Sequence, residues 1–136
     1  MKEQLEAVKI FQKAFGQNVS STPTLISKEK AELRYQLGLE ELNEYSVAVV
    51  EGNLVEVADS LVDQLYILCG TILEHGMQEI IEDCFREVQR SNMSKLDDDG
   101  KPIINGENGV LDLKRAMGKV LKSSNFSEPN LKQFLK

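Results

Sequence analysis

The chain has 136 residues, enough for one domain with a hydrophobic core of its own. Hydrophobic residues make up 41% of it and charged residues 28%, which is an ordinary globular balance. The net charge of −6 argues against broad binding to nucleic acids or to anionic membranes, which are themselves negatively charged.

The cysteines and the hydropathy of the chain bear on its compartment. Cys69 and Cys84 are isolated thiols without a CxxC spacing, so we expect them to be reduced and buried. No apolar run approaches the length of a membrane span, and the polar first four residues do not resemble a signal peptide. We therefore expect a cytoplasmic protein that has neither a membrane nor a nucleic-acid polymer as its partner.

Apolar residues recur at helical spacing through the first two thirds of the chain and predict four helices. Their expected ranges are 2–15, 28–50, 54–74 and 77–91. The predicted inner face of the first helix consists of Leu5, Val8, Phe11 and Phe15. Ser27 is a suitable N-cap for the second helix, and the short break that follows requires the second and third helices to run antiparallel.

The character of the chain changes after residue 92. Turn-forming residues fill 97–102 and 105–109, and ten of the 16 basic residues lie from Arg86 onward. A short helix is expected over 111–121. The second part of the chain is thus basic, whereas the middle is acidic.

These elements together predict the fold class. Long helices with short connections bury their apolar faces against one another. We expect an all-α protein, a four- to five-helix bundle with a turn-rich C-terminal segment. It should form a single domain over residues 1–136, with a helical core at 1–92 and a basic, loop-rich tail at 93–136.

Acidic residues gather on the second and third predicted helices without a base among them. In chain order they are Glu40, Glu41, Glu44, Glu56, Asp59 and Asp63. They contain one Glu-x-x-Glu and one Glu-x-x-Asp spacing, and no Lys or Arg occurs from residue 35 to residue 85. Residues three or four apart share one side of a helix, so each pattern crowds carboxylates that repel one another.

Helical phase favours an inward direction for these acids over the simpler alternative, a solvated acidic stripe. Each acidic stripe continues lengthwise into apolar residues of its own helix, such as Leu37 on the second and Ile67 on the third. The hairpin brings the two stripes opposite each other, and carboxylates inside a bundle need partners. Four to six carboxylates around one gap suit a hard divalent cation, Mg²⁺ or alternatively Mn²⁺.

Other metal sites lack their ligands in this sequence. A di-iron bundle requires Glu-x-x-His on two helices, but the only histidine is His75, at a helix end, where a structural or surface role is expected. A calcium-binding loop aligned on Gly100 would begin with Lys95 and end with Gly106, where acids are required.

The acids and the basic tail suggest phosphate chemistry. Mg²⁺ held by carboxylates commonly accompanies phosphate esters, and a carboxylate that is not fully used as a ligand can take a proton from water. Basic side chains of the tail would neutralise phosphates beyond the reach of the metal. The candidates are Lys95, Lys101, Lys119 and Lys122.

Several segments beyond the acids match one known superfamily. The two acidic spacings lie within LEELNE at 39–44 and EVADSLVDQLY at 56–66. More specific are EVQRSNMSK at 87–95, DGKP at 99–102 and GKVLK at 118–122. Together they resemble the all-α nucleoside triphosphate pyrophosphohydrolases, which include MazG-like proteins, dimeric dUTPases and phosphoribosyl-ATP pyrophosphatases, and in particular the phosphoribosyl-ATP pyrophosphohydrolase-like subgroup. The resemblance covers nearly the whole chain and implies a bundle of the all-α NTP pyrophosphatase type.

The resemblance implies Mg²⁺-dependent cleavage of a (d)NTP between its α and β phosphates, giving (d)NMP and pyrophosphate, in nucleotide-pool house-cleaning. The implied metal ligands are Glu41, Glu44, Glu56 and Asp59, with Asp63 joining a second metal. The implied catalytic acids are Glu40, Glu41 and Glu44, of which Glu40 is the spare carboxylate for a second ligand shell or a general base.

The resemblance also implies substrate contacts and an assembly. The implied substrate-binding residues are Asn92 and Lys95 and, with less support, Lys101, Lys119 and Lys122. The tail would close over the bound nucleotide. Members of the superfamily commonly form dimers or tetramers with sites built across subunits, so we expect a homodimer or homotetramer.

The chain departs from the subgroup in one place, and three alternatives stay open. Residues 108–117 are extra length, which would displace Lys119 and Lys122 from the substrate. Phosphoribosyl-ATP hydrolysis in histidine synthesis would differ only in its substrate. A non-catalytic helical oligomer would bind nucleotide or a partner protein without turnover, and a helical scaffold with a solvated acidic stripe would gain no stability from divalent cations.

Overall fold

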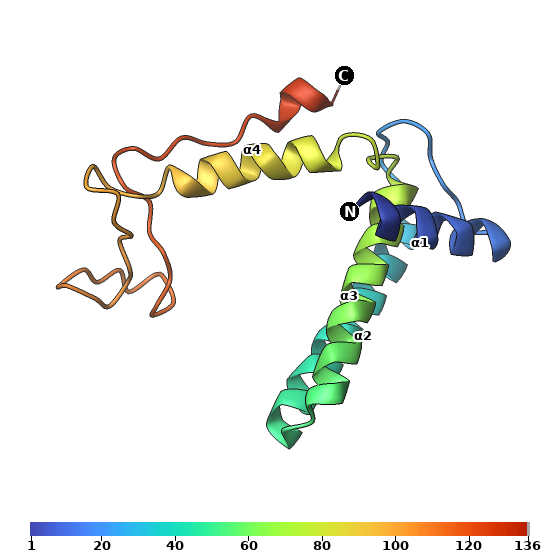
Figure 1. Ribbon diagram of the computed structural model, residues 1–136, viewed down its shortest axis with the longest axis horizontal. Helices are drawn as coiled ribbons and strands as arrows, with labels where there is room; N and C mark the ends of the chain where they lie inside the picture. Colours follow the sequence, from blue (N-terminus) through green and yellow to red (C-terminus); the bar gives the residue numbers. More distant parts are fainter. Residues whose placement is uncertain (136) are drawn as a thin grey trace. The chain divides into compact units, whose positions relative to one another are not determined.

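Residues 1–135 are described by a computed structural model, in which they form four α-helices and one short 3-10 helix (Figure 1). The elements are α1 (Lys2–Ala14), α2 (Lys28–Glu51), α3 (Leu54–Glu74), α4 (Ile81–Met93) and η1 (Leu131–Phe134). The chain divides into two compact units, Met1–Ile81 and Glu82–Lys136. The described part contains no β-strand, only an isolated bridge between Ile104 and Val120, so the predicted all-α class is confirmed.

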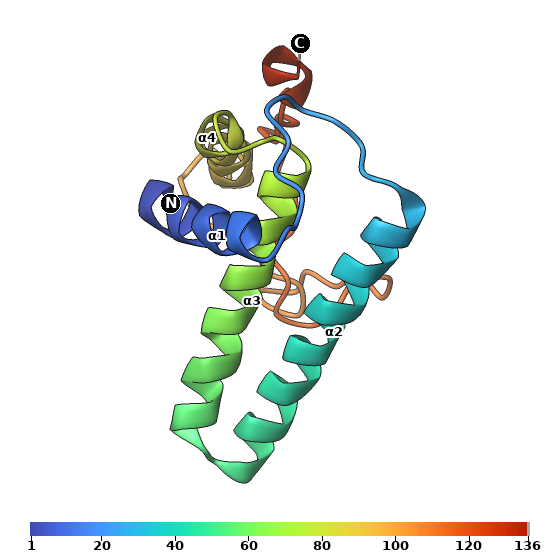
Figure 2. The ribbon, with the colours of Figure 1, turned by 90° about the vertical axis from the view of Figure 1, so that its right-hand side faces the viewer.

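In the first unit, α2 and α3 form a long antiparallel hairpin (Figure 2). Ser27 caps α2, as its position in the sequence predicts, because its Oγ accepts a backbone N–H of the first turn at 3.3 Å. Gly52 ends α2 with a φ of 68°, a left-handed conformation that strains most L side chains. The side chain of Asn53 then accepts the N–H groups of Val55 and Glu56, which starts α3.

The core of this unit lies where α1 packs against α3. It consists of Leu5, Val8, Cys69, Ile72 and Leu73, with Val19, Met77 and Ile81 packed around it. The predicted inner face of α1 is wrong at two positions, because Phe11 is 38% exposed and Phe15 is 69% exposed. Their rings pack on each other instead, with 4.3 Å between centroids.

Gln12 is buried where the sequence suggested an aromatic ring. It follows Leu5 and Val8 at helical spacing, so the face of α1 that meets α3 is narrower than the run of apolar residues indicates. The Nε2 atom of Gln12 donates to the Gly70 carbonyl at 3.2 Å. This hydrogen bond gives a buried polar side chain a partner on α3.

A buried ion pair joins α2 to the C-terminal end of α3. Arg34 Nη2 lies 2.6 Å from Glu74 Oε1, and the two side chains are only 12% and 8% exposed. A Cβ atom at Gly70 would lie 3.1 Å from Arg34 Nη1, so the absence of a side chain lets the guanidinium pass close to α3. Removing either partner would leave the other charge buried and unpaired, which is strongly destabilising.

A glycine turn follows α3. Gly76 donates to the Leu73 carbonyl at 3.1 Å and Met77 donates to the Ile72 carbonyl at 3.0 Å, the hydrogen-bond pattern of a Schellman motif. This turn ends one helix before the next begins. The helix predicted at 77–91 therefore starts at Ile81, and the predicted start is wrong.

The loop before α2 passes over this turn. A Cβ at Gly76 would collide with the backbone of Thr22, so this approach requires glycine. Thr24 donates its N–H to the His75 carbonyl at 2.9 Å, and His75 Nδ1 lies 2.8 Å from the Thr24 carbonyl oxygen. His75 thus joins the loop to the end of α3.

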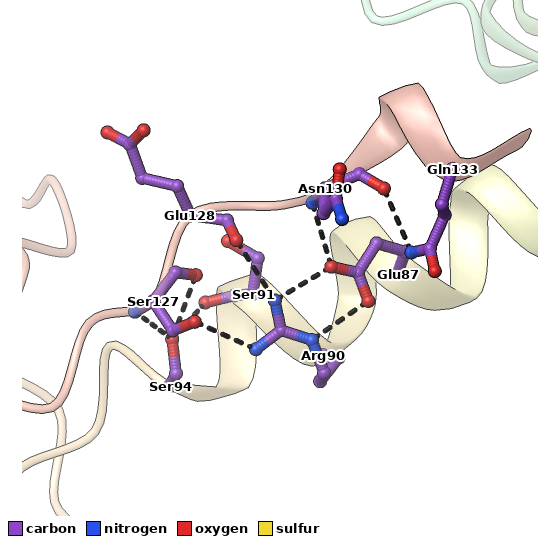
Figure 3. A network of polar contacts seen from close by, with 8 residues as sticks. All are labelled: Glu87, Arg90, Ser91, Ser94, Ser127, Glu128, Asn130 and Gln133. Atoms are coloured by element: carbon purple, nitrogen blue, oxygen red, sulfur yellow. Dashed lines mark hydrogen bonds and ion pairs between the residues drawn. The ribbon is translucent and has the colours of Figure 1, made fainter. Parts of the chain in front are cut away.

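In the second unit, a polar network joins α4 to the segment 127–130 (Figure 3). Arg90 donates two hydrogen bonds to Glu87, at 2.8 and 2.9 Å, and others to Ser127 Oγ and to the Glu128 carbonyl. Glu87 also accepts the Asn130 N–H at 2.9 Å. The hydrogen bonds from Arg90, and then that from Asn130, lower the pKa of Glu87 from 4.5 to about 2.

The segment 105–119 is a closed loop. Its conformation is held by Asn105, which is only 1% exposed. Its Nδ2 lies within 3.0–3.1 Å of the carbonyl oxygens of Asp112, Arg115 and Ala116. Its Oδ1 accepts the Asp112 N–H at 2.7 Å. The predicted helix at 111–121 is wrong, because Asn105 engages carbonyls that a helix would bond to its own N–H groups.

The α2–α3 hairpin leaves large apolar side chains open to solvent. They include Leu39, Leu42, Val47, Leu61, Leu65 and Leu68. Among residues 1–135, no helix combines the length and the apolar character needed to cross a membrane. Apolar surface of this extent on a helix pair is typical of contacts with another chain or a ligand.

Acid should loosen the contact between α4 and the segment 127–130. Because the pKa of Glu87 is depressed in the folded state, its contribution to stability is complete above 4.5 and is lost as the pH falls towards 2. Glu87→Gln should cause the same loss at neutral pH. NMR hydrogen exchange at the Asn130 amide should show protection reduced by about tenfold, the order expected for one charge-assisted hydrogen bond.

Glu107→Gln is the matched control, since this exposed acid of the same unit lies outside the network. Its Asn130 amide should exchange as in the wild-type protein. Equal protection at pH 7 and pH 3 in the wild-type protein would contradict the assignment.

Candidate active site

The acids of α2 and α3 act on one another across the hairpin. Glu41 on α2 is close enough to Asp59 and Asp63 on α3 for their charges to affect its ionisation, as do those of its neighbours Glu40 and Glu44. Glu41 and Asp63 are half-buried, while the other four acids of the set are exposed. The structure thus brings four of the other five predicted acids around Glu41.

Glu56 stands apart from this group. It lies in the first turn of α3, near the Gly52 turn, and its charge is not among those that act on Glu41. Its backbone N–H bonds to the Asn53 cap, and its carbonyl accepts the Ser60 hydroxyl at 2.6 Å. Glu56 shares its helical face with Asp59, three residues on, so a ligand bound at Asp59 is within reach of its side chain.

Glu41 is the most perturbed acid of the set. Its Oε2 atom is buried and has no hydrogen-bond partner among the described residues. Burial raises the pKa of Glu41 above its ordinary value, and the charges of Glu44, Asp63, Glu40 and Asp59 raise it further. Perturbation by burial and by like charges is typical of functional sites.

No base compensates this negative charge from within the hairpin. Arg34 is the nearest base in the sequence, and it is paired with Glu74 at the other end of α3. The uncompensated carboxylates and the buried oxygen of Glu41 fit a divalent cation, which prefers oxygen ligands. Within residues 1–135, no three His, Cys, Asp or Glu side chains already converge as a ligand set.

Three of the predicted substrate-binding residues lie around one cavity in the second unit. The cavity has a volume of about 450 Å³ and is lined by Lys95, Asp112, Arg115, Lys119, Val120, Leu121 and Lys122. The extra length at 108–117 therefore does not separate Lys119 and Lys122 from Lys95. It folds back into a loop whose ends meet at the Ile104–Val120 bridge.

The other two predicted substrate residues are placed differently. Asn92 is not in the cavity lining, but its Oδ1 accepts a hydrogen bond from Lys95 Nζ at 2.7 Å and so orients that ammonium. Lys101 lines a separate cavity of about 350 Å³ together with Asp97 and Pro102. The structure therefore groups Lys95, Lys119 and Lys122 and leaves Lys101 apart.

Sequence reasoning missed Arg115, a fourth cationic residue of the 450 Å³ cavity. Arg115 lies in the extra length at 108–117, which was expected only to displace Lys119 and Lys122. The signal that could have found it is the Asn-Gly pair at 105–106, a turn former. An asparagine there can organise the following loop and bring its basic residues back to Lys119 and Lys122.

Comparison with protein families gives a match to phosphoribosyl-ATP pyrophosphohydrolase over residues 8–92. The chain belongs to the phosphoribosyl-ATP pyrophosphohydrolase family. The matched region contains the whole α2–α3 hairpin and all six acids. The cavity lined by Lys95, Arg115 and Lys119 lies beyond it. A comparison with curated proteins gives no match.

Membership of this family establishes the class of reaction. The protein is a pyrophosphohydrolase, a hydrolase that acts on phosphoric anhydride bonds, and belongs to the all-α NTP pyrophosphohydrolase superfamily. Enzymes of the family generally depend on a divalent metal. The two non-enzymatic alternatives, a nucleotide-binding oligomer and an acidic scaffold, are therefore set aside.

Replacing Glu41 should stabilise the metal-free protein. Because its pKa is raised on folding, the folded protein holds a proton at a pH where the unfolded chain has released it. The stability of the metal-free protein therefore falls as the pH rises through the folded-state pKa. Glu41→Gln removes this loss, and the Tm in EDTA at pH 7 should rise by roughly 2–5 °C.

The same variant should respond less to metal. Magnesium at about 100 times its Kd stabilises a folded protein by about 2.7 kcal/mol, and Glu41→Gln should lose most of that gain. Glu51→Gln, at the end of the same helix and outside the group around Glu41, should match the wild-type protein in both measurements. An unchanged Tm in EDTA combined with full stabilisation by Mg²⁺ would show that Glu41 is not at the metal site.

Proposed function

We propose that this enzyme hydrolyses a (d)NTP between its α and β phosphates, giving (d)NMP and pyrophosphate, in control of the cytoplasmic nucleotide pool. The observation that carries the proposal is the carboxylate group around Glu41, which has no counter-charge and includes a buried oxygen without a partner. Such a group fits Mg²⁺, or alternatively Mn²⁺, and these cations accompany triphosphates.

The proposed metal ligands are Glu41, Glu44, Glu56 and Asp59, with Asp63 available for a second ion. A bound divalent cation offsets the negative charge of the phosphate oxygens and lowers the pKa of water. Glu40 is the proposed general base, since it is exposed and next to Glu41 but is not needed as a ligand. A water oxygen bonds to one of the two phosphorus atoms joined by the α–β bridging oxygen, and the bond from that phosphorus to the bridging oxygen breaks. The bridging oxygen leaves with the other phosphate product, and the proton of the water passes to the Glu40 carboxylate.

The proposed substrate contacts come from the second unit. Lys95, Lys119 and Lys122 would neutralise phosphate oxygens, with Asn92 orienting Lys95 through the 2.7 Å hydrogen bond. Lys101 is the least supported member of the set, because it lines another cavity. The proposed role of the tail at 93–136 is to close over the nucleotide.

The proposed enzyme is a homodimer or homotetramer. The support is the apolar surface of the α2–α3 hairpin, where side chains such as Leu42, Leu61 and Leu68 are more than half exposed. A second copy of the chain covering this surface would complete a bundle that the single chain leaves open.

Phosphoribosyl-ATP is the second candidate substrate. The name of the matching family favours it directly. It carries the same triphosphate, so the proposed roles of the acids and lysines would not change. The two candidates differ only in the groups that contact the base and the additional ribose phosphate.

A substrate panel tests the proposal. The (d)NTPs and phosphoribosyl-ATP are incubated separately with Mg²⁺ and with Mn²⁺, and pyrophosphate release is measured. We expect metal-dependent turnover of at least one (d)NTP. Glu41→Gln and Asp59→Asn should each lower kcat by about 100-fold or more, the usual effect of losing a group that acts in the transition state.

Glu51→Gln is again the control and should keep wild-type turnover. Turnover of phosphoribosyl-ATP alone would replace the first candidate by the second. A blank panel with both metals would overturn the proposal.

A further inference from the structure

The 450 Å³ cavity of the second unit is strongly cationic. Lys95, Arg115, Lys119 and Lys122 line it, with Asp112 as the only acid. The volume falls within the range of small-molecule sites. The cavity lies within a single compact unit and beyond the residues of the family match. The resemblance implies Lys95, Lys119 and Lys122 as substrate contacts, but not Arg115.

The positive charges of the cavity are only partly compensated within the unit. Asp112 Oδ2 lies 3.9 Å from Arg115 Nε, and Glu128 Oε1 lies 3.9 Å from Lys122 Nζ. Both distances exceed that of a good hydrogen bond, and the four side chains of these two pairs are 43–83% exposed. Among residues 1–135, no acid is paired with Lys95 or with Lys119. A ligand with several negative charges would complete the set.

The loop that carries Arg115 is held in a defined conformation. The Nδ2 atom of Asn105 donates to the Arg115 carbonyl at 3.0 Å, and its Oδ1 accepts the Asp112 N–H. The Asn105 N–H donates to the Lys119 carbonyl, and its carbonyl accepts the Gly118 N–H, each at 2.9 Å. One buried residue therefore fixes the backbone at both Arg115 and Lys119, which reduces the entropy lost when a ligand orders their side chains.

We propose that this cavity binds a condensed phosphate chain, a di- or triphosphate, and that the loop at 105–118 completes it by supplying Arg115. A guanidinium matches phosphate oxygens through paired hydrogen bonds, and three ammonium groups surround the remaining charge. Asn105 is a positioning residue that acts through Arg115 and Lys119. Where the bound phosphate chain is part of the substrate, this site rests on the proposed function. Where the bound anion is free pyrophosphate, the site does not depend on it.

Calorimetry with inorganic tripolyphosphate tests the site without turnover. The full-length protein is titrated in EDTA at about 0.1 M salt, where exposed charges are screened within about 10 Å. Arg115→Ala should weaken binding by about three- to tenfold. Arg115→Lys should weaken it by less, because lysine keeps the positive charge but lacks the paired N–H donors of the guanidinium. Lys119→Ala is a second variant and should weaken binding similarly. Lys114→Ala removes the same charge from the residue next to Arg115, outside the cavity lining, and should leave Kd unchanged.

Two outcomes would overturn the proposal. One is the absence of tripolyphosphate binding by the wild-type protein. The other is an equal loss of affinity in Lys114→Ala and Arg115→Ala, which would indicate attraction by net charge without a site. Because the titration needs no metal and no hydrolysis, its result is independent of a blank substrate panel.

Kinetics with the same variants identify the source of the anion. A rise in KM of a hydrolysed nucleotide with Arg115→Ala, matching the loss of tripolyphosphate affinity, assigns the cavity to the triphosphate of the substrate. An unchanged KM combined with weaker product inhibition by pyrophosphate assigns it to the free anion. Both results support a condensed-phosphate site and differ only in where its ligand comes from.

Discussion

Uncompensated negative charge between α2 and α3 constrains the first unit more than any other interaction. Glu41 is surrounded by four like charges, and the nearest base in sequence, Arg34, is bound to Glu74. The hairpin is instead held at its ends, by the Gly52 turn and by the ion pair and α1 contacts near Gly70. Its middle therefore remains electrostatically unsatisfied, and the proposed cation would stabilise the fold by binding there.

The two units differ in their charge. Met1–Ile81 contains thirteen acidic and six basic residues, whereas Glu82–Lys136 contains nine acidic and ten basic ones. The acidic unit holds the carboxylates that suit a metal, and the other holds the cationic cavity. The family match covers the acids but not the cavity.

Local signals made most of the helices predictable from the sequence. The Ser27 cap and the periodicity of apolar residues placed α2 and α3 within a residue of their observed ends. Phe11 and Phe15 were placed wrongly because the buried width of a helix depends on its partner, which periodicity does not reveal. The prediction of a helix at 111–121 was wrong for a similar reason. A residue outside this segment, Asn105, donates hydrogen bonds to carbonyl oxygens within it.

The grouping of the acids was predictable from the sequence, whereas their role in a site stays a prediction. Helical phase and the short hairpin predicted that Glu41 lies opposite Asp59 and Asp63. They could not predict that a single oxygen of Glu41 is buried, because this depends on side-chain packing. Arg115 was missed because it reaches the cavity only through the loop. That loop closes on itself, since the Ile104–Val120 bridge joins its ends and Asn105 bonds its interior. Its length can therefore change during evolution while α4 and the polar network beyond it stay in place, which offers related chains a route to new anion preferences without altering the acids.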